Sequence, residues 1–328
     1  MLRSTSSDWC IPVAMTGLLD RLVVIDAMEL RSRVPMRVAI RAVQAVLESG
    51  FDPARDPIRT IVDVEHGQLL LMPSDLGRYV GQKLATVAPG NPARGLERIQ
   101  GVYLLLDGET LTPMAILDGT ELTSIRTPAV SAAGVDLLAP ADARSLVVFG
   151  TGPQGIRHVE AMRAIRPIER VRFVGRDRAR ADDAVRAIEA PGLDAAVGSV
   201  DDVRDADLVV CATTARSPLF EADLVADHAV VVAVGSHEPD ARELDAALIA
   251  RSQVVVETPE VALREAGDVV LAIEEGAFDP GSLVSLAEVV TRRAPVDVGR
   301  PRVLKTSGMG WEDLAVATAV LDHGTAAD

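Results

Sequence analysis

A glycine cluster between an apolar run and a helical pattern limits most strongly how this chain can fold. The run SLVVFG comes first, and apolar residues then recur at every third position from Ile156 to Ile165, as on one face of a helix. Gly150, Gly152 and Gly155 follow a G-x-G-x-x-G spacing at this junction. In a strand–glycine–helix context the spacing is typical of a dinucleotide cradle, whose helix N-terminus offers free N–H groups to phosphates. The alternative is a tight turn in an unrelated α/β protein.

Each glycine of the cluster has a separate expected role. Gly150 makes the tight turn, Gly152 lets the backbone approach a pyrophosphate, and Gly155 lets the helix pack on the sheet. His158, on the same helix, is expected to be structural. The predicted cofactor-binding residues are Gly150, Thr151, Gly152, Pro153, Gln154, Gly155, Gly175, Arg176, Arg178, Thr213 and Gly235.

The end of the next predicted strand bears on which dinucleotide is bound. Enzymes that select NAD place Asp or Glu there, about 20 residues after the last glycine, to bind the ribose hydroxyls. This chain has Gly175 and then Arg176, which leaves room for a 2′-phosphate that Arg176 and Arg178 could bind. The sequence therefore favours NADP(H), with NAD(H) as the other possibility. In the alternative interpretation Asp177 binds the ribose and both arginines are solvated.

The middle of the chain alternates between apolar runs and helical patterns. The runs are continuously apolar, which indicates strands buried on both faces of a parallel sheet. This rhythm predicts an α/β fold with a Rossmann-type doubly wound parallel sheet. The predicted strands are 145–150, 170–175, 195–198, 206–213, 228–236 and 252–257, and the predicted helices are 155–165, 178–188 and 241–250.

The rest of the sequence predicts a second, smaller α+β domain. Its strand-like segments are separated by Gly, Pro and Asp-Gly turns, a pattern typical of antiparallel pairing. We assign residues 17–128 and 310–328 to this domain, and residues 129–309 to the doubly wound domain. A helix over 126–140, closed by a proline, is expected to bridge the two domains. A last helix, 311–322, is expected to pack back on the N-terminal domain.

The composition argues against several kinds of partner. The net charge is −15, whereas nucleic acids and anionic membranes require a basic face. No apolar run reaches the roughly 18 residues of a membrane-spanning helix. Cys10 and Cys211 stand far apart, which indicates a reducing, cytoplasmic location without a disulfide framework, and the histidine and cysteine spacings predict no metal site. Residues 1–16 are expected to form a poorly ordered leader rather than a signal peptide.

Three cations of the N-terminal domain are candidates for binding an anionic substrate. Lys83 lies in an apolar strand segment, where an unpaired charge is costly. Arg126 lies at the start of the expected bridging helix, from which it could hold a carboxylate beside a nicotinamide. Arg59 lies upstream of the segment LLLMP. Taken singly, each of them could instead be a surface salt-bridge partner.

These segments carry a resemblance to a known family. Over roughly residues 20–322 the chain resembles the ornithine cyclodeaminase and mu-crystallin family, through LLLMP, GQKLATVAPGN, ILDGTELTSIRTPAVSA, GTGPQGIRHVEA, VGSHEPDARELD and KTSGMGWEDLA. The resemblance implies a homodimer in which the Rossmann-type domain is inserted into the smaller substrate-binding and dimerisation domain. It also implies that Arg59 and Arg126 bind the carboxylate of a small amino or imino acid, while Lys83 contacts the substrate and handles its proton. A buried lysine of lowered pKa can act as such an acid or base, and we expect the two arginines to help lower the pKa of Lys83 by like-charge repulsion.

One position departs from the family pattern and bears on the reaction. Cyclodeaminases of the family look to carry an Asp, which helps bind the distal amine, where this chain has His237 followed by Glu238. A histidine is a poor partner for an ammonium group. We therefore expect NAD(P)H-dependent reduction of a cyclic or small α-imino acid, or reversible dehydrogenation of a small amino acid, with Lys83 and His237 as candidate catalytic residues.

Three other interpretations stay open. One is an ornithine or lysine cyclodeaminase that releases ammonia with bound NAD. Another is a non-catalytic dinucleotide-binding protein of the crystallin kind, against which the set of Arg59, Lys83 and Arg126 argues. In the third, His237 is a loop residue without a chemical role.

Overall fold

In the computed structural model, which describes residues 17–322, the continuously apolar runs become one sheet of eight parallel strands. Their order is β13-β12-β14-β11-β10-β7-β8-β9. The chain runs from β7 outward to β9 and then returns past β7 to β10, so the connections diverge between β7 and β10, where such folds bind ligands. The predicted Rossmann-type α/β fold is thus confirmed. The strands are β7 (Ser145–Phe149), β8 (Arg170–Val174), β9 (Asp194–Val197), β10 (Leu208–Cys211), β11 (Val230–Ala233), β12 (Gln253–Val256), β13 (Val284–Ser285) and β14 (Arg302–Lys305).

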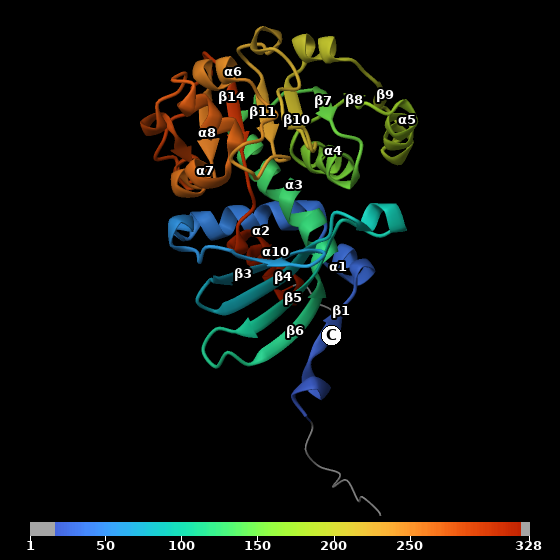
Figure 1. Cartoon of the computed structure of the whole chain (residues 1–328), viewed down its shortest axis with the longest axis vertical. Coiled ribbons are helices and arrows are strands. Elements are labelled where there is room, and N and C mark those ends of the chain that lie inside the picture. Colours follow the sequence, from blue (N-terminus) through green and yellow to red (C-terminus); the bar gives the residue numbers. More distant parts are fainter. Residues whose placement is uncertain (1–16, 323–328) are drawn as a thin grey trace, which may run out of the picture.

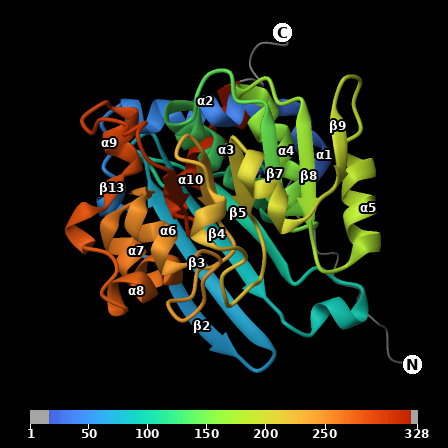
Figure 2. The same ribbon diagram turned by 90° about the horizontal axis from the view of Figure 1, so that it is seen from above.

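Helices flank this upper sheet. Figure 2 shows α5 beside β8 and β9 at one end of the sheet, and α7 and α8 at the other. Apolar side chains on both faces of the strands are buried, in two separate clusters. The helices are α4 (Pro153–Ile165), α5 (Arg178–Ala187), α6 (Ala246–Arg251), α7 (Pro259–Glu265), α8 (Gly267–Glu274) and α9 (Leu286–Val290).

A second sheet lies below the first and is mostly antiparallel, as its turn-rich sequence predicts (Figure 1). Its order is β1-β6-β5-β4-β3-β2, and only β1 pairs in parallel, with β6. Three helices lie between the two sheets: α2 (Met36–Glu48), α3 (Gly119–Leu138) and α10 (Gly310–Asp322). Helix α10 packs on β3 and β4, which confirms the expected packing of the last helix. The remaining elements are β1 (Val23–Ile25), β2 (Thr60–Val64), β3 (Gly67–Asp75), β4 (Tyr79–Val87), β5 (Ile99–Asp107), β6 (Pro113–Asp118) and α1 (Ala27–Arg33).

The bridging helix begins earlier than the sequence suggests. The prediction of a helix over 126–140 is wrong at its start, because α3 begins at Gly119, where Asp118 accepts a hydrogen bond from the Glu121 N–H. Threonine and serine side chains often favour non-helical conformations, because they can bond to nearby backbone groups. Here the Thr123 and Ser124 hydroxyls instead donate to carbonyls one turn back in the helix. Helix α3 therefore runs across the proposed domain boundary after residue 128. The two-domain division itself stays a proposal.

Two elements of the upper sheet also differ from expectation. Strand β14 was not predicted, because two of its four residues are charged, yet it lies between β11 and β12 and is buried. The helix predicted over 241–250 is confined to α6, since Asp245 caps the Leu248 N–H. The N–H groups of Glu243 and Leu244 instead bond to the Asp268 carboxylate.

The predicted leader, residues 1–16, and Cys10 lie outside the described residues. Within residues 17–322, no helix combines the length and apolar character that crossing a membrane would require.

Candidate active site

The glycine cluster has the geometry of a dinucleotide cradle. Gly150 has φ +109°, and a Cβ atom added there would lie 2.3 Å from the Ala212 carbonyl oxygen. A Cβ on Gly155 would lie 2.1 Å from the Gly150 oxygen, so the helix packs too closely for any side chain. Gly152 faces open space and begins α4 without a side-chain cap. The N–H groups of the first turn of α4 are therefore available to a phosphate.

The residues after β8 bear on the two interpretations of cofactor choice. The Asp177 carboxylate accepts hydrogen bonds from the N–H groups of Ala179 and Arg180, so it caps α5. Arg178 pairs with Asp182 at 3.3 Å. Arg176 is exposed and has no hydrogen-bond or ion-pair partner in the part of the chain that the structure describes. A Cβ on Gly175 would lie 2.7 Å from Thr151 Cγ2, so a larger side chain at this position would require Thr151 to move.

A cavity of about 320 Å³ lies where the carboxyl edge of the upper sheet faces the lower sheet. It brings together predicted substrate residues and predicted cofactor residues that are far apart in the sequence. Its wall includes Arg59, Lys83, Arg126, Gln154, Thr213, Gly235 and His237. Arg176 and Arg178 are not part of the wall.

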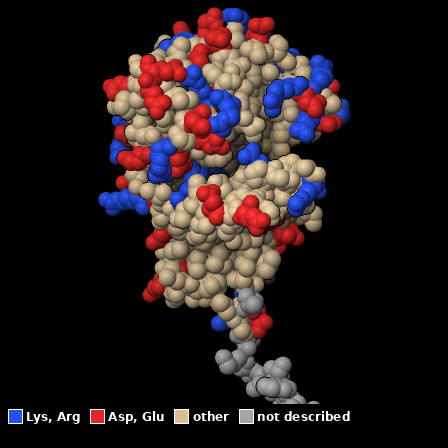
Figure 3. Space-filling view, viewed as in Figure 1, with Lys and Arg blue, Asp and Glu red and all other residues tan. Residues whose placement is uncertain are grey.

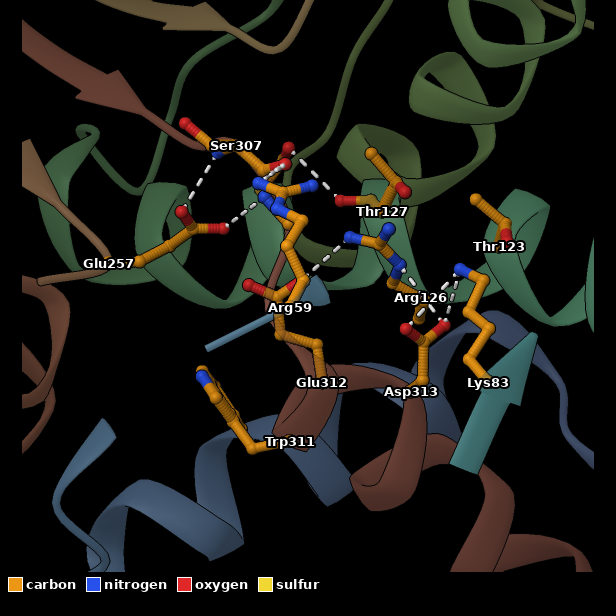
Figure 4. Close-up of polar contacts among 12 residues, drawn as sticks. Arg59, Lys83, Thr123, Arg126, Thr127, Glu257, Ser307, Trp311, Glu312 and Asp313 are labelled. Atoms are coloured by element: carbon orange, nitrogen blue, oxygen red, sulfur yellow. Dashed lines mark hydrogen bonds and ion pairs between the residues drawn. The ribbon is translucent and has the colours of Figure 1, made fainter. Parts of the chain in front are cut away.

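Lys83 is buried at one side of this cavity and pairs with a carboxylate. Its Nζ lies 3.0 Å from Oδ1 and 3.3 Å from Oδ2 of Asp313, in the first turn of α10 (Figure 4). Burial lowers the pKa of Lys83 to about 8, Asp313 opposes this shift, and Arg126 adds to it. The expectation that both arginines lower this pKa is therefore only partly right, because burial dominates and Arg59 is not among the causes.

Arg126 is buried beside Lys83 and meets two carboxylates. Its Nη1 donates to Glu312 Oε2 at 2.6 Å, and its Nε lies 3.3 Å from Asp313 Oδ1. Its Nη2 has no hydrogen-bond partner among residues 17–322. Only 8% of Arg126 and 3% of Lys83 is exposed, so neither is a surface salt-bridge partner.

Arg59 approaches the same cavity from the start of β2. Its Nη2 donates to the Glu265 carboxylate and, at 3.3 Å, to the Ser307 carbonyl. The three predicted cations therefore line one cavity, each already in contact with a carboxylate.

Comparison with known proteins identifies the family. The sequence model of the ornithine cyclodeaminase/mu-crystallin family matches residues 23–327. The chain belongs to this family. A Δ1-pyrroline-2-carboxylate reductase of Burkholderia ambifaria is 33% identical over 93% of this chain and 96% of that protein. The solved Thermococcus litoralis Δ1-pyrroline-2-carboxylate reductase, in complex with NADH and L-proline, has a TM-score of 0.86 at 26% identity, over 93% of this chain and 98% of that one. An archaeal alanine dehydrogenase dimer with bound NAD also has a TM-score of 0.86 at 26% identity, over 93% and 96% of the two chains.

These relatives confirm the predicted family and the predicted enzyme class, an oxidoreductase of the ornithine cyclodeaminase/mu-crystallin family. At the position where the cyclodeaminases of the family look to carry an Asp, His237 is an exposed residue on the cavity wall. Partial desolvation and the nearby Arg59 lower its pKa. His158 is fully buried, with Nε2 2.9 Å from Ser131 Oγ and Nδ1 2.8 Å from the Gln154 carbonyl. Burial lowers the pKa of His158 to about 4, so this ring links α3 to α4 in its neutral form.

Several carboxylates of the site were not identified from the sequence. Glu312 and Asp313 belong to the WED segment of the last motif, where acidic residues at a helix start have an ordinary explanation. Glu243 lies beneath the cofactor side of the cavity. It accepts hydrogen bonds from Thr213 N at 2.8 Å, Thr213 Oγ1 at 2.7 Å and Gly235 N at 2.8 Å. It therefore ties together the two loops that supply these predicted cofactor-binding residues.

Proposed function

We propose that this protein is an NAD(P)H-dependent reductase of a compact cyclic α-imino acid of the Δ1-pyrroline-2-carboxylate class. One observation carries the proposal: Lys83 and Arg126 line the same cavity as Thr213 and Gly235 of the upper sheet. The cradle at Gly150–Gly155 fits a dinucleotide, which when bound supplies the hydride that reduces the imine carbon. The chemistry left to the protein is to hold the substrate carboxylate and to manage the proton of the imine nitrogen.

The cations divide this work between them. Glu312 accepts a hydrogen bond from Nη1 of Arg126, Asp313 lies 3.3 Å from Nε, and the Nη2 side remains available to a carboxylate. Arg59 offers a second cation on the same wall. Lys83, with a pKa of about 8, still carries its proton near neutral pH and can donate it to the imine nitrogen. A protonated imine is the more electrophilic form.

The cavity wall is better suited to this substrate than to ornithine. No Asp or Glu stands among the described residues that line it. Glu238, the acidic neighbour of His237, pairs instead with Arg216. A distal ammonium group would lose water there without gaining a carboxylate. The apolar part of the wall, which suits an aliphatic ring, consists of Leu70, Met72, Ala85, Val87, Ile99, Ala212 and Val234.

Incubating the protein with NADPH and Δ1-pyrroline-2-carboxylate is the direct test. We expect oxidation of NADPH and formation of proline, and little ammonia from ornithine with catalytic NAD. The readouts are absorbance of the reduced cofactor, chiral analysis of the product and an ammonia assay. The variant His237→Ala should largely keep the reductase activity. Robust release of ammonia from ornithine, dependent on His237 or Glu238, would restore the cyclodeaminase interpretation.

For the cofactor we propose a preference for NADP(H). Asp177 is engaged as a helix cap, whereas Arg176 is exposed and unpaired within the described chain, which supports binding of a 2′-phosphate. Losing one charge-assisted contact costs about 1.5–3 kcal/mol, so Arg176→Ala should reduce the NADPH over NADH preference by about tenfold or more. Arg180→Ala is the matched control, because Arg180 is exposed in the first turn of α5, four residues after Arg176, and lies 3.8 Å from Asp177. Titrations of NADPH and NADH with the wild type and both variants measure this preference. Tighter binding of NADH than of NADPH by the wild type would contradict the proposal.

We also propose a homodimer formed through the lower sheet. Figure 3 shows few charged residues over the lower part of the molecule, in contrast to the upper part. Val24, Val62 and Val102 lie on the same face of this sheet and are 69%, 42% and 50% exposed. Apolar side chains exposed together on a sheet are typical of a protein interface. The free, buried Cys211 is compatible with a reducing, cytoplasmic location, which stays part of the proposal.

A further inference from the structure

Two buried carboxyl groups lie close to Arg126, on the side away from Lys83. Glu312 comes from α10, and Glu257 directly follows β12. Both residues are buried, with 0% and 2% of their surface exposed. Glu312 Oε2 accepts from Arg126, but Oε1 is buried without a partner in the described chain. Gly308 and Arg126 bring the two groups close together: Glu257 Oε1 accepts from Gly308 N at 2.7 Å, and a Cβ on Gly308 would lie 2.6 Å from the Arg126 Nη1 that donates to Glu312. Accordingly, the charge of Glu257 and a side-chain hydrogen bond with it both raise the pKa of Glu312. Two ionised carboxylates in such a place would repel each other strongly.

Glu257 is the better hydrogen-bonded member of the pair. Its two oxygens accept hydrogen bonds from the backbone N–H groups of Ser307, at 2.8 Å, and Gly308, at 2.7 Å. Two N–H donors stabilise a carboxylate. Among residues 17–322, Glu312 has only Arg126 as a donor, and burial together with Glu257 raises its pKa well above the usual range for glutamate.

We propose that Glu312 carries a proton on Oε1 and donates it to Glu257, so that the pair shares one proton and acts as a positioning element for the substrate-binding arginines. The proton turns the unpartnered Oε1 into a donor and removes the repulsion between the two groups. The activity part of this inference rests on the proposed function, whereas the protonation state does not.

The shared proton matters for the charge of the site. The groups that face Glu312 are Arg126 on α3, Glu257 after β12 and Asp313 on α10, with Lys83 on β4 beyond Asp313. With the proton in place, the two cations balance the carboxylates of Asp313 and Glu257. Without it, the cluster carries one extra negative charge beside Arg126. That charge would oppose binding of the substrate carboxylate.

Glu257 and Glu312 also position the two arginines, Arg59 and Arg126. Glu257 holds the N–H groups of Ser307 and Gly308, and the Ser307 carbonyl accepts a hydrogen bond from Arg59. Gly308 has φ +85°, and a Cβ there would lie 2.6 Å from Arg126 Nη1, so this loop lies flat against the guanidinium group. Glu312 holds the same Nη1 from the other side.

Paired isosteric variants test the inference. In Glu312→Gln the amide still donates to Glu257 and accepts from Arg126, so the KM for the imino acid should stay within about threefold of wild type at neutral pH. In Glu257→Gln an amide NH₂ faces one of the two backbone N–H groups, and we expect KM to rise by about tenfold or more with little change in cofactor affinity. Glu260→Gln is the matched control, because Glu260 is exposed on α7. Thermal melts establish that each variant is folded.

Two further readouts separate a shared proton from a plain ion pair. As pH rises, wild-type KM should increase when Glu312 loses its proton, and Glu312→Gln should lack that increase. An infrared difference spectrum of wild type minus Glu312→Gln should contain the C=O band of a protonated carboxyl group at pH 8, where Asp56, with a pKa of about 6, is mostly ionised. The spectrum requires no substrate, so it remains decisive even if the proposed reaction is wrong. Absence of the band, or equal damage by the two Gln variants with an unchanged pH profile, would make Glu312 an ordinary ion-pair partner and overturn the inference.

Discussion

Replacing Arg126 with alanine is expected to lower kcat/KM for the imino acid by about two to four orders of magnitude while leaving the affinity for NADPH within about twofold. The substrate carboxylate loses its guanidinium partner. In addition, Glu312 and Asp313 lose the cation that lies between them. Breaking a buried ion pair by removing one partner costs about 3–5 kcal/mol, which corresponds to a loss of between about two and four orders of magnitude if it falls on the transition state.

The measurements are kcat/KM for the imino acid and the dissociation constant for NADPH, with a thermal melt to establish folding. Arg126→Lys keeps the charge without the planar fork, so it should recover only a small part of the activity. Arg98→Ala is the control for general loss of positive charge, because Arg98 also lines the cavity but is exposed. Near-normal turnover by Arg126→Ala would leave Arg126 with a structural role only.

The upper sheet could be predicted because its sequence signals are local. The glycine spacing and the apolar runs each follow from what one strand, turn or helix requires. Strand β14 could not be predicted from an apolar run, because charged residues, Arg302 and Lys305, occupy two of its four positions. Their charges are satisfied only in the folded molecule, where Arg302 donates to the carbonyls of Leu138 and His228 and Lys305 lies 3.2 Å from Asp268.

The cationic residues of the candidate site could be predicted from the sequence, but its carboxylates could not. A lysine inside an apolar strand is unusual enough to be noticed in one sequence. Its partner Asp313 lies 230 residues away and looks like any acidic residue at the start of a helix. Glu257 follows a buried strand, and nothing nearby indicates that its carboxylate binds the loop at Ser307 and Gly308. Such partners are set by tertiary contacts that a single sequence does not encode locally.

Replacing Lys83 with methionine is expected to reduce kcat for imine reduction by about a hundredfold to ten-thousandfold, the usual contribution of a general acid. Methionine fills a similar volume, so the cavity should keep its shape. Asp313 would lose its Lys83 partner but keep Arg126 nearby, 3.3 Å from its Oδ1. His237→Ala serves as the comparison, because His237 lies at the same cavity but is expected to have little effect. Near-wild-type turnover by Lys83→Met would remove Lys83 from the reaction.

The pH dependence gives the sharper test of Lys83 as the proton donor. Its pKa of about 8 lies below the ordinary 10.5 because of burial, and Asp313 holds it above the value that burial alone would produce. Reduction requires the protonated form, so kcat should fall as pH rises through about 8. In Asp313→Asn the carboxylate that favours the charged lysine is gone, so the alkaline fall should begin at lower pH. Lys83→Arg keeps a positive charge whose proton is not released in this range, so its residual rate should show no such fall. Among the described residues, Asp313 is the carboxylate bonded directly to Lys83. If kcat of Asp313→Asn falls at the same pH as kcat of the wild type, the group that titrates is not Lys83.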